Sequence, residues 1–313
     1  MKPFDVTAIG ELNADLVLSG LQSLPEAGRE ISVPNCSLTL GSSTAICAAG
    51  IARLGLRTAF LGKMGDDLFG ETIWRELEKY GIDLSHVRME PSLQTGLTVS
   101  LSTSRDRALV TYMGSIDSLH PADVDPAVLD YTRHIHVGSY FLQKNLRAGL
   151  PALFSTAHTK GVTTSLDAGW DDTEQWDSGI RETLRQTDLF FPNEEEAMRI
   201  TGKHDTGEAA MELSKWCGTA VVKLGSHGAT AARRGEIFHC EAFRGLKVAD
   251  TTGAGDSFNA GFLYAFLDGK DLMECLQFGN ACGALSVTRQ GGASSCASLQ
   301  EVECLIRKHT VAK

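Results

Sequence analysis

Two patterns of hydrophobic and polar residues divide the chain into segments of different character. In residues 12–40 and 95–114, short apolar or alternating stretches follow one another with turns between them, which is typical of strands in a turn-connected sheet. We predict strands here at 12–18, 31–40, 97–103 and 108–113, with a hairpin turn at 104–107. Two excursions of the chain are therefore expected to form one small β-sheet.

The remaining segments alternate between short apolar strands and helical patterns. Strands are predicted at 4–9, 58–61, 135–137, 163–167, 189–191 and 219–224. Helices are predicted at 43–54, 69–80, 150–159, 180–184, 194–201, 207–217 and 276–287. This alternation predicts an α/β fold, in which a mainly parallel sheet has helices on both faces. We expect residues 1–11, 41–94 and 115–313 to form this three-layer core, with ligands bound beyond the carboxyl ends of its strands.

The nine residues DTTGAGDSF, at 250–258, carry the most distinctive chemistry. An apolar segment at 245–249 predicts a strand before them, and apolar residues at helical spacing predict a helix over 254–267. A glycine-rich turn that opens a helix aims backbone N–H groups at one point, where the helix dipole also favours negative charge. Asp256, in the first turn, would then take a proton from an attacking hydroxyl beside this anion site. An ordinary helix start with an acid that complements the dipole also explains these residues.

The composition limits the partners and the cellular compartment that are compatible with this chemistry. The chain has 313 residues, of which 42% are hydrophobic and 22% charged, as in a soluble globular protein with a sizeable core. A net charge of −10 argues against nucleic acid or an anionic membrane surface as a partner. No apolar run reaches membrane-spanning length, and the eight cysteines lack metal-ligand spacing. Cys47, Cys275 and Cys282 fall in apolar helical patterns, so we expect buried thiols and a reduced, cytoplasmic enzyme.

Two common phosphate-binding motifs are absent from the sequence, and DTTGAGDSF is the remaining candidate for a phosphate site. The sequence contains neither GxxxxGK[ST] nor GxGxxG, which argues against a Walker P-loop and a dinucleotide site. DTTGAGDSF instead resembles the C-terminal signature of the ribokinase-like (PfkB-type) sugar and nucleoside kinases. The resemblance implies a ribokinase-like fold whose small sheet is a lid, and phosphorylation of a hydroxyl by ATP with Mg²⁺. It also implies that Asp256 is the base and that an anion hole is formed by Gly253, Ala254 and Gly255.

Two earlier segments resemble the acceptor-binding elements of the same family. GELNADLVLSG resembles the segment that carries a substrate-binding aspartate, which implies acceptor contacts for Asn13 and Asp15. From the residues alone, a surface acid in a turn also explains Asp15. Gly41 and Ser42 resemble the family's double glycine, with Ser42 in place of the second glycine. Ile46 stands where the family usually has a sugar-contacting asparagine, so the resemblance does not extend to the standard ribose contacts at this position.

Later segments resemble the nucleotide and cation sites of the family. The N-x-x-E pattern of Asn193 and Glu196 implies Mg²⁺ binding through water, which suits a hard cation that keeps most of its waters. Acids in a first helical turn also fit dipole complementation alone. Contacts with ATP are implied for Lys223, Gly225, Gly228 and Asn280. Asp250 and Thr252 resemble positions that give oxygen ligands to a monovalent cation such as K⁺.

Together these features favour an ATP-dependent sugar kinase that acts on a small carbohydrate, with the lid excluding water. A nucleoside kinase of the same family is one alternative. A catalytically silent sugar-binding regulator is another, although the intact Asp256 argues against it. The resemblance and the apolar residues of the small sheet predict a homodimer joined through the lid. We expect no nucleic-acid partner and no membrane partner.

Overall fold

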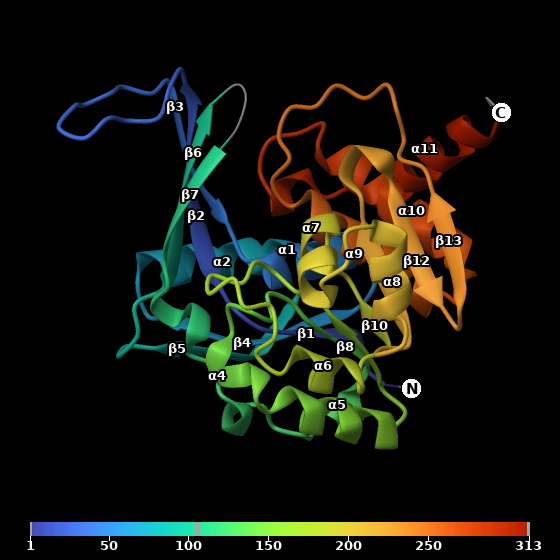
Figure 1. Ribbon diagram of the computed structural model, residues 1–313. Helices are drawn as coiled ribbons and strands as arrows, with labels where there is room; N and C mark the ends of the chain where they lie inside the picture. The colour runs from blue at the N-terminus through green and yellow to red at the C-terminus, as the bar shows by residue number, and fades with distance from the viewer. Residues whose placement is uncertain (1, 104–106, 312–313) are drawn as a thin grey trace.

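The computed structural model describes residues 2–103 and 107–311, and its largest element is a sheet that runs through the middle of the molecule (Figure 1). The strands of this sheet are β1 (Phe4–Ile9), β4 (Thr58–Gly65), β5 (Asp83–Glu90), β8 (Thr132–Val137), β9 (Thr163–Leu166), β10 (Leu189–Phe190), β11 (Thr219–Lys223), β12 (Ala229–Arg233) and β13 (Glu236–Cys240). Their order is β13-β12-β11-β10-β9-β8-β1-β4-β5. From β11 to β5 the neighbours pair in parallel, and β12 and β13 continue the sheet as an antiparallel edge. The predicted mainly parallel sheet is therefore confirmed.

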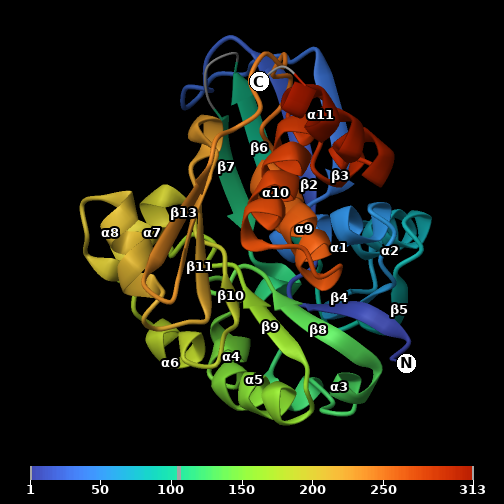
Figure 2. The same ribbon diagram turned by 90° about the vertical axis from the view of Figure 1, so that its right-hand side faces the viewer.

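Helices cover both faces of this sheet (Figure 2). One face carries α1 (Ser43–Arg53), α2 (Leu68–Lys79), α9 (Ala254–Leu267), α10 (Leu272–Ser286) and α11 (Leu299–Val311). The other carries α3 (Val128–Tyr131), α4 (Lys144–Arg147), α5 (Leu150–Thr159), α6 (Ile180–Leu184), α7 (Glu194–Thr201) and α8 (Thr206–Leu213). Because side chains alternate along a strand, Val221 joins the apolar cluster under α9 while Val222 joins the cluster under α5 to α8. Both faces of the central strands are thus buried, which explains their continuous apolar sequences.

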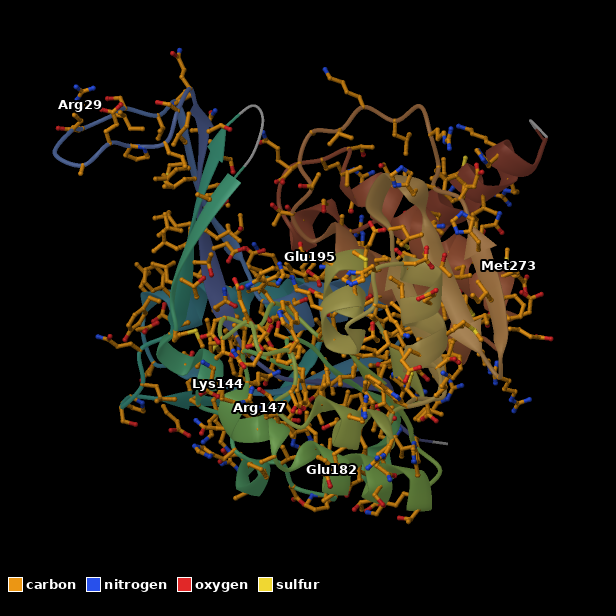
Figure 3. All side chains as sticks on the ribbon, in the orientation of Figure 1. Arg29, Lys144, Arg147, Glu182, Glu195 and Met273 are labelled. Carbon is orange, nitrogen blue, oxygen red and sulfur yellow. The ribbon has the colours of Figure 1, made fainter. Side chains whose placement is uncertain are left out.

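A smaller second sheet projects from the core beside the carboxyl ends of the parallel strands (Figure 1). Its strands are β2 (Asn13–Leu21), β3 (Asn35–Leu40), β6 (Gly96–Thr103) and β7 (Arg107–Tyr112), in the order β3-β2-β6-β7. β2 pairs in parallel with β6, because the two excursions leave the core separately, and the outer pairs are antiparallel. Figure 3 places Arg29, ion-paired with Glu26 at 2.8 Å, at the end of the long β2–β3 loop and away from the core.

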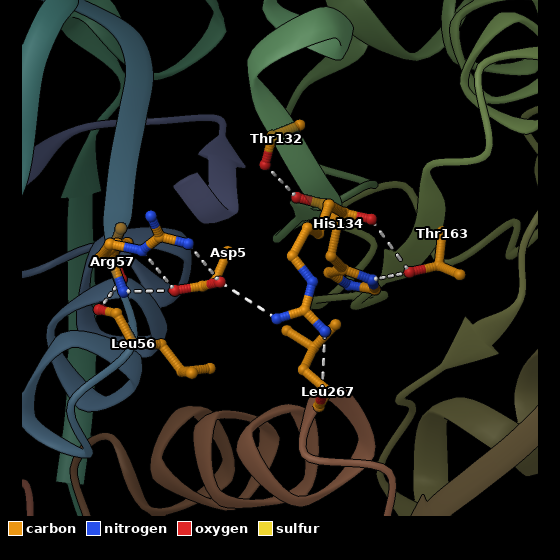
Figure 4. A network of polar contacts seen from close by, with 9 residues as sticks. Asp5, Leu56, Arg57, Thr132, His134, Thr163 and Leu267 are labelled. Atoms are coloured by element: carbon orange, nitrogen blue, oxygen red, sulfur yellow. Dashed lines mark hydrogen bonds and ion pairs between the residues drawn. The ribbon is translucent and has the colours of Figure 1, made fainter. Parts of the chain in front are cut away.

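A partly buried polar network ties the far end of α9 to the central sheet (Figure 4). Asp5 of β1 accepts hydrogen bonds from Arg57 Nε at 3.0 Å and from Arg133 Nη1 at 3.1 Å. Arg133 also donates to the carbonyl oxygen of Leu267, the last residue of α9, at 3.0 Å. Next to it, His134 Nδ1 pairs with the Thr163 hydroxyl at 2.7 Å. The C-terminal end of α9 is therefore anchored, which fixes where its N-terminal end lies.

The structure corrects the prediction for the segment before α9. Residues 245–249 form no strand. Instead, the amides of Ala249 and Asp250 donate to the carbonyl oxygen of Val287, just beyond α10, at 2.7 and 3.2 Å. The segment docks on a helix end, so its apolar character reflects packing rather than strand pairing. The sequence analysis also missed β5, β13 and α11.

Other predictions have mixed outcomes. The predicted helix at 207–217 ends at Leu213, and residues 104–106 of the predicted hairpin turn lie outside the described residues. Cys47, Cys275 and Cys282 are buried free thiols, as predicted. Within the described part of the chain, no helix is long and apolar enough to cross a bilayer.

Candidate active site

Helix α9 begins on a glycine that no larger residue can replace without strain. Gly253 caps the helix with a φ of 73°, in the left-handed region that favours glycine. A Cβ at this position would lie 2.9 Å from the Cα of Gly292 and 3.0 Å from Cγ2 of Ile46. The start of α9 is therefore pressed against these two neighbours. Its first-turn amides and the positive end of its dipole make this point a candidate anion site.

Two cavities meet at the N-terminus of α9. The smaller, of about 250 Å³, is lined by the predicted acceptor residues Asn13, Asp15 and Ser42 and by Thr252, Gly253 and Asp256. The larger, of about 610 Å³, is lined by the predicted nucleotide residues Lys223, Gly225, Gly228 and Asn280 and by Thr251, Ala254 and Gly255. The first turn of α9 is thus the boundary between them, and its residues are divided between the two sides.

Asp256 lies at this boundary, and its pKa is raised above the usual value for an aspartate. Its Oδ1 accepts a hydrogen bond from the hydroxyl of Ser43, the first residue of α1. Burial, and then the negative charge of Asp167, raise the pKa of Asp256 to about 7, although Ser43 and Lys223 act against this shift. A carboxyl group with such a pKa can accept and release a proton near neutral pH.

Lys223 and Asp167 form a buried ion pair behind the anion site. Lys223 Nζ lies 2.6 Å from Asp167 Oδ2, an oxygen that also accepts from Asn259 Nδ2 at 2.6 Å. Although burial opposes ionisation of Asp167, the charge and hydrogen bond of Lys223 hold the pKa of Asp167 below its usual value. A Cβ on Gly255 would lie 3.5 Å from Lys223 Nζ, so this cation stands directly beside the start of α9.

Asn193 and Glu196 form a reciprocal capping box at the start of α7. Asn193 Oδ1 accepts from the Glu196 amide at 2.9 Å, and Glu196 Oε2 accepts from the Asn193 amide at 2.8 Å. Burial, and then the charge of Asp167, raise the pKa of Glu196 to about 7. Both residues therefore have a structural role as helix caps. The box also holds the Glu196 carboxyl near the Asp167–Lys223 pair.

Two of the predicted acceptor residues, Asn13 and Asp15, lie on the same face of strand β2 in the second sheet. Asn13 Nδ2 donates to Asp15 Oδ1 at 3.1 Å. Gly41 lies against both side chains, because a Cβ there would be 2.3 Å from Asp15 Oδ1 and 2.5 Å from Asn13 Nδ2. The glycine is therefore required for this close approach, and the small cavity opens beside the two polar side chains.

The position of Ser42 explains why a glycine is usual there. Ser42 has a φ of 68°, a conformation that costs free energy for a residue with a side chain. Its hydroxyl donates to the carbonyl oxygen of Glu11 at 2.7 Å and accepts from the Ala45 amide at 2.9 Å. Glu11 is 2% exposed and also accepts from Thr44 Oγ1 at 2.7 Å and from Ser139 Oγ at 2.9 Å. Burial raises the pKa of Glu11 against these hydrogen bonds.

Ile46 gives the small cavity an apolar wall. It is 3% exposed, and its side chain contacts the backbone positions of Gly253 and Gly292. At the position where the resemblance leads one to expect an asparagine, this chain therefore places a hydrocarbon surface next to the start of α9.

The large cavity is mostly apolar away from α9. Gly228 has a φ of 93°, and a Cβ there would lie 2.1 Å from the carbonyl oxygen of Cys240. Asn280 Nδ2 donates to this same oxygen at 2.9 Å. The remaining wall includes Phe243, Leu246, Val248, Ala284 and Val287. Such a surface suits a flat base held by stacking and apolar contact.

Asp250 joins the two loops beside the start of α9. Its Oδ1 accepts from the amide and the hydroxyl of Thr252, at 2.9 and 2.8 Å, and its Oδ2 accepts from the Gly291 amide at 2.9 Å. The predicted cation residues are therefore adjacent, and they stabilise the loop that leads into Gly253.

Sequence reasoning gave no role to several residues that the structure brings to this site. Asp167, Glu11 and Ser43 contact predicted site residues or shift the pKa of Asp256. Asn259 in turn donates a hydrogen bond to Asp167. Glu11 follows the first predicted strand and Asp167 ends another, so their place at the carboxyl edge of the sheet was the available signal. The pairing of Ser43 with Asp256 spans 213 residues and has no local signal.

Two separate cavities that meet at one helix N-terminus suit the transfer of a group between two bound molecules. Comparison with known proteins gives the family: residues 4–299 match the pfkB family carbohydrate kinases, and the chain belongs to that family. The fold is therefore the ribokinase-like three-layer architecture with a small second sheet, as predicted. The enzyme is a carbohydrate kinase that phosphorylates sugars with ATP, which is also as predicted.

Relatives of known name agree with this assignment. A ribokinase from Haemophilus influenzae is 29% identical over 306 residues, covering 95% of this chain and 96% of the relative. An ATP-dependent ribose-1-phosphate kinase from Halopiger xanaduensis is 30% identical over 292 residues, covering 93% and 94%. The solved structure of Arabidopsis thaliana ribokinase complexed with ribose and ATP has a TM-score of 0.85 and 27% identity, covering 98% and 99% of the two chains.

Proposed function

We propose that this kinase binds its sugar in the 250 Å³ cavity, binds ATP in the 610 Å³ cavity, and uses Asp256 as the general base. The observation that carries the proposal is the division of the first turn of α9 between the two cavities. Asp256 and Gly253 line the acceptor side, and Ala254 and Gly255 line the nucleotide side. A phosphoryl group that passes from one cavity to the other must cross this turn.

Each group then has one task. Asn13 and Asp15 bind hydroxyls of the sugar and orient it, with Gly41 and Ser42 shaping the cavity around them. The reacting hydroxyl gives its proton to the Asp256 carboxylate as its oxygen attacks the γ-phosphorus. The amides at the start of α9 and the Lys223 ammonium stabilise the charge on the phosphoryl oxygens. Gly225, Gly228 and Asn280 shape the wall on the nucleotide side.

The residues fit a Mg²⁺ ion that is held mainly by water and phosphate. Within residues 2–103 and 107–311, no three His, Cys, Asp or Glu side chains come together as a ligand set. Mg²⁺ commonly keeps several waters and binds through few carboxylates and the phosphates of the substrate. Asn193 and Glu196 would hold its water shell, and the ion would neutralise phosphate charge. We assign a K⁺ site to the loop of Asp250 and Thr252.

The small sheet formed by residues 12–40 and 95–114 is proposed as the lid of the acceptor cavity and as a dimer interface. Its inner face carries Asn13, Asp15, Thr98 and Ser100, which line the cavity. By strand register, the outer face carries the rows Leu16–Val99–Val110 and Leu18–Leu101–Ala108. Val110 is 62% exposed in the single chain. Burial of this apolar face against a second copy would stabilise both sheets.

Light scattering at micromolar concentration tests the dimer. We expect a dimer mass for the wild type and a monomer mass for Val110→Glu, which places a charge on the outer face. Met273→Glu is the control, because Met273 is also exposed (41%) but lies on α10, far from the lid (Figure 3). A wild-type monomer, or equal dissociation of both variants, would contradict the lid interface.

A panel of acceptors in a coupled ADP-release assay tests the kinase proposal. Relatives named ribokinase, fructokinase and ribose-1-phosphate kinase make ribose, fructose and ribose-1-phosphate the first acceptors to compare, followed by nucleosides. We expect acceptor-dependent ADP release with at least one free sugar. Release with nucleosides alone would support the nucleoside kinase instead, and no acceptor-dependent release would overturn the proposal.

A further inference from the structure

The first residue of α1 contacts the proposed base directly. Ser43 donates its hydroxyl proton to Asp256 Oδ1, and both side chains line the acceptor cavity. Ser43 is not needed to cap the helix, because the preceding Ser42 accepts from the Ala45 amide. Its hydroxyl is therefore available for a role that concerns Asp256 alone.

This contact distinguishes the two oxygens of the carboxylate. Within the described residues, Oδ1 accepts from Ser43 and no side chain donates to Oδ2. A carboxylate held at one oxygen cannot rotate freely about its last bond, so the second oxygen keeps a fixed direction. That second oxygen is the one left to receive the proton of an acceptor hydroxyl.

We propose that Ser43 is a positioning residue for phosphoryl transfer: it fixes the orientation of the Asp256 carboxylate and favours its ionised form. The proposal deepens the function above and rests on Asp256 being the base. A hydrogen bond donated to a carboxylate stabilises the charged form. Without it, Asp256 would hold its proton to higher pH and would sample orientations that miss the acceptor.

Several other charged or titratable groups also act on the Asp256 carboxylate. Titratable or charged side chains act on Asp256 from the residue after β9, from β11, from the segment after β1, from α1 and from the segment after α10. In that order they are Asp167, Lys223, Glu11, Cys47 and Cys296. Asp167 and Glu11 raise the pKa of Asp256, whereas Lys223 and Ser43 lower it. All of these remain when Ser43 is replaced, so the change isolates one hydrogen bond.

The test is the pH profile of kcat/KM with the acceptor that the panel identifies. For the wild type we expect activity to fall as pH drops below about 7, because Asp256 then becomes protonated. This fall in activity on the acid side of the profile is its acid limb. In Ser43→Ala the acid limb should lie at a pH about one unit higher, and kcat should fall by more than the KM for ATP changes. Ser43→Thr should restore the wild-type limb, and Ser43→Cys, a weaker donor, should fall between.

A neighbouring serine provides the matched control. Ser257 is equally a small hydroxyl residue, is buried next to Asp256 in the chain, and has only a weak contact with Cys296 Sγ at 3.9 Å. Ser257→Ala should leave the acid limb in place. An unmoved limb in Ser43→Ala, or the same shift in Ser257→Ala, overturns the role of Ser43. Wild-type turnover in Asp256→Asn would instead overturn the base, so the two failures are distinguishable.

Discussion

Replacing Asp167 by asparagine removes the negative member of the buried ion pair while keeping the size of the side chain. The Lys223 ammonium, 2.6 Å away, then loses its closest counter-charge, and the hydrogen bond that Asn259 donates loses a charged acceptor. The side chains of Asp167 and Lys223 are 5% and 14% exposed, so water cannot replace the missing partner. Glu196 is the next acid near Lys223 and offsets only part of the loss.

The expected cost follows from this burial. Removal of one member of a buried ion pair destabilises proteins by about 3–5 kcal/mol. For a chain of 313 residues, an unfolding entropy of about 2.1 cal/mol/K per residue converts this range into a fall in Tm of about 5–8 °C. Because Glu196 remains, we expect a value near the lower end.

Differential scanning fluorimetry of the ligand-free protein measures this effect. Asp172→Asn is the control, because it removes the acid of an exposed pair, Lys144–Asp172, with the similar separation of 2.8 Å. That variant should lose less than about 1 kcal/mol, or about 1–2 °C. The double variant Asp167→Asn, Lys223→Met should recover part of the lost stability, because it leaves no buried charge without a partner.

The reasoning fails if Asp167→Asn melts within about 1 °C of the wild type, or no lower than Asp172→Asn. A second readout concerns the base. Since Asp167 raises the pKa of Asp256, its neutralisation should move the acid limb of kcat/KM to lower pH, opposite to the shift expected for Ser43→Ala.

Two further predictions concern the acceptor side and the pH dependence of stability. Asp15→Ala should raise the KM for the sugar at least about tenfold and leave the KM for ATP nearly unchanged, because Asp15 lines only the acceptor cavity; equal effects on both constants would mean a structural role. Asp256→Asn should melt higher than the wild type at pH 8. The folded-state pKa of Asp256, about 7, lies above that of an unfolded aspartate, so ionisation destabilises the wild type above pH 7 by up to about 4 kcal/mol. This advantage should shrink as pH falls from 7 towards 4, and a difference independent of pH would contradict the raised pKa.

Local patterns predicted much of the fold because the local signals and the tertiary environment agree. The run at 219–224 is apolar on both faces, and it becomes β11 in the interior of the sheet. The acids after Asn193 mark a helix start, and α7 begins there with a full capping box. By contrast, 245–249 has strand-like composition but no strand neighbour, so it packs on the end of α10. The apolar residues of this segment predicted that it packs against the protein, but they could not predict which element it packs against.

The site was predictable where its chemistry is contiguous in the chain. Gly253 to Asp256 form one turn, so their joint role could be inferred from nine residues. Asp167 contacts Lys223 across 56 residues and Asn259 across 92, and such pairings depend on strand order rather than on sequence spacing. The same is true of Ser43. The family resemblance indicated Gly41, and the structure adds the reason, which is the close approach of Asp15 and Asn13.

The turnover of Asp256→Asn with the best acceptor tests the central claim most directly. The substitution keeps the size of the side chain and the start of α9 but removes the proton acceptor at the boundary of the two cavities. We expect kcat to fall by about 10²–10⁴-fold while ATP binding, measured by calorimetry, stays within about twofold of the wild type. Near wild-type turnover with intact ATP binding would contradict the assignment of Asp256 as the base.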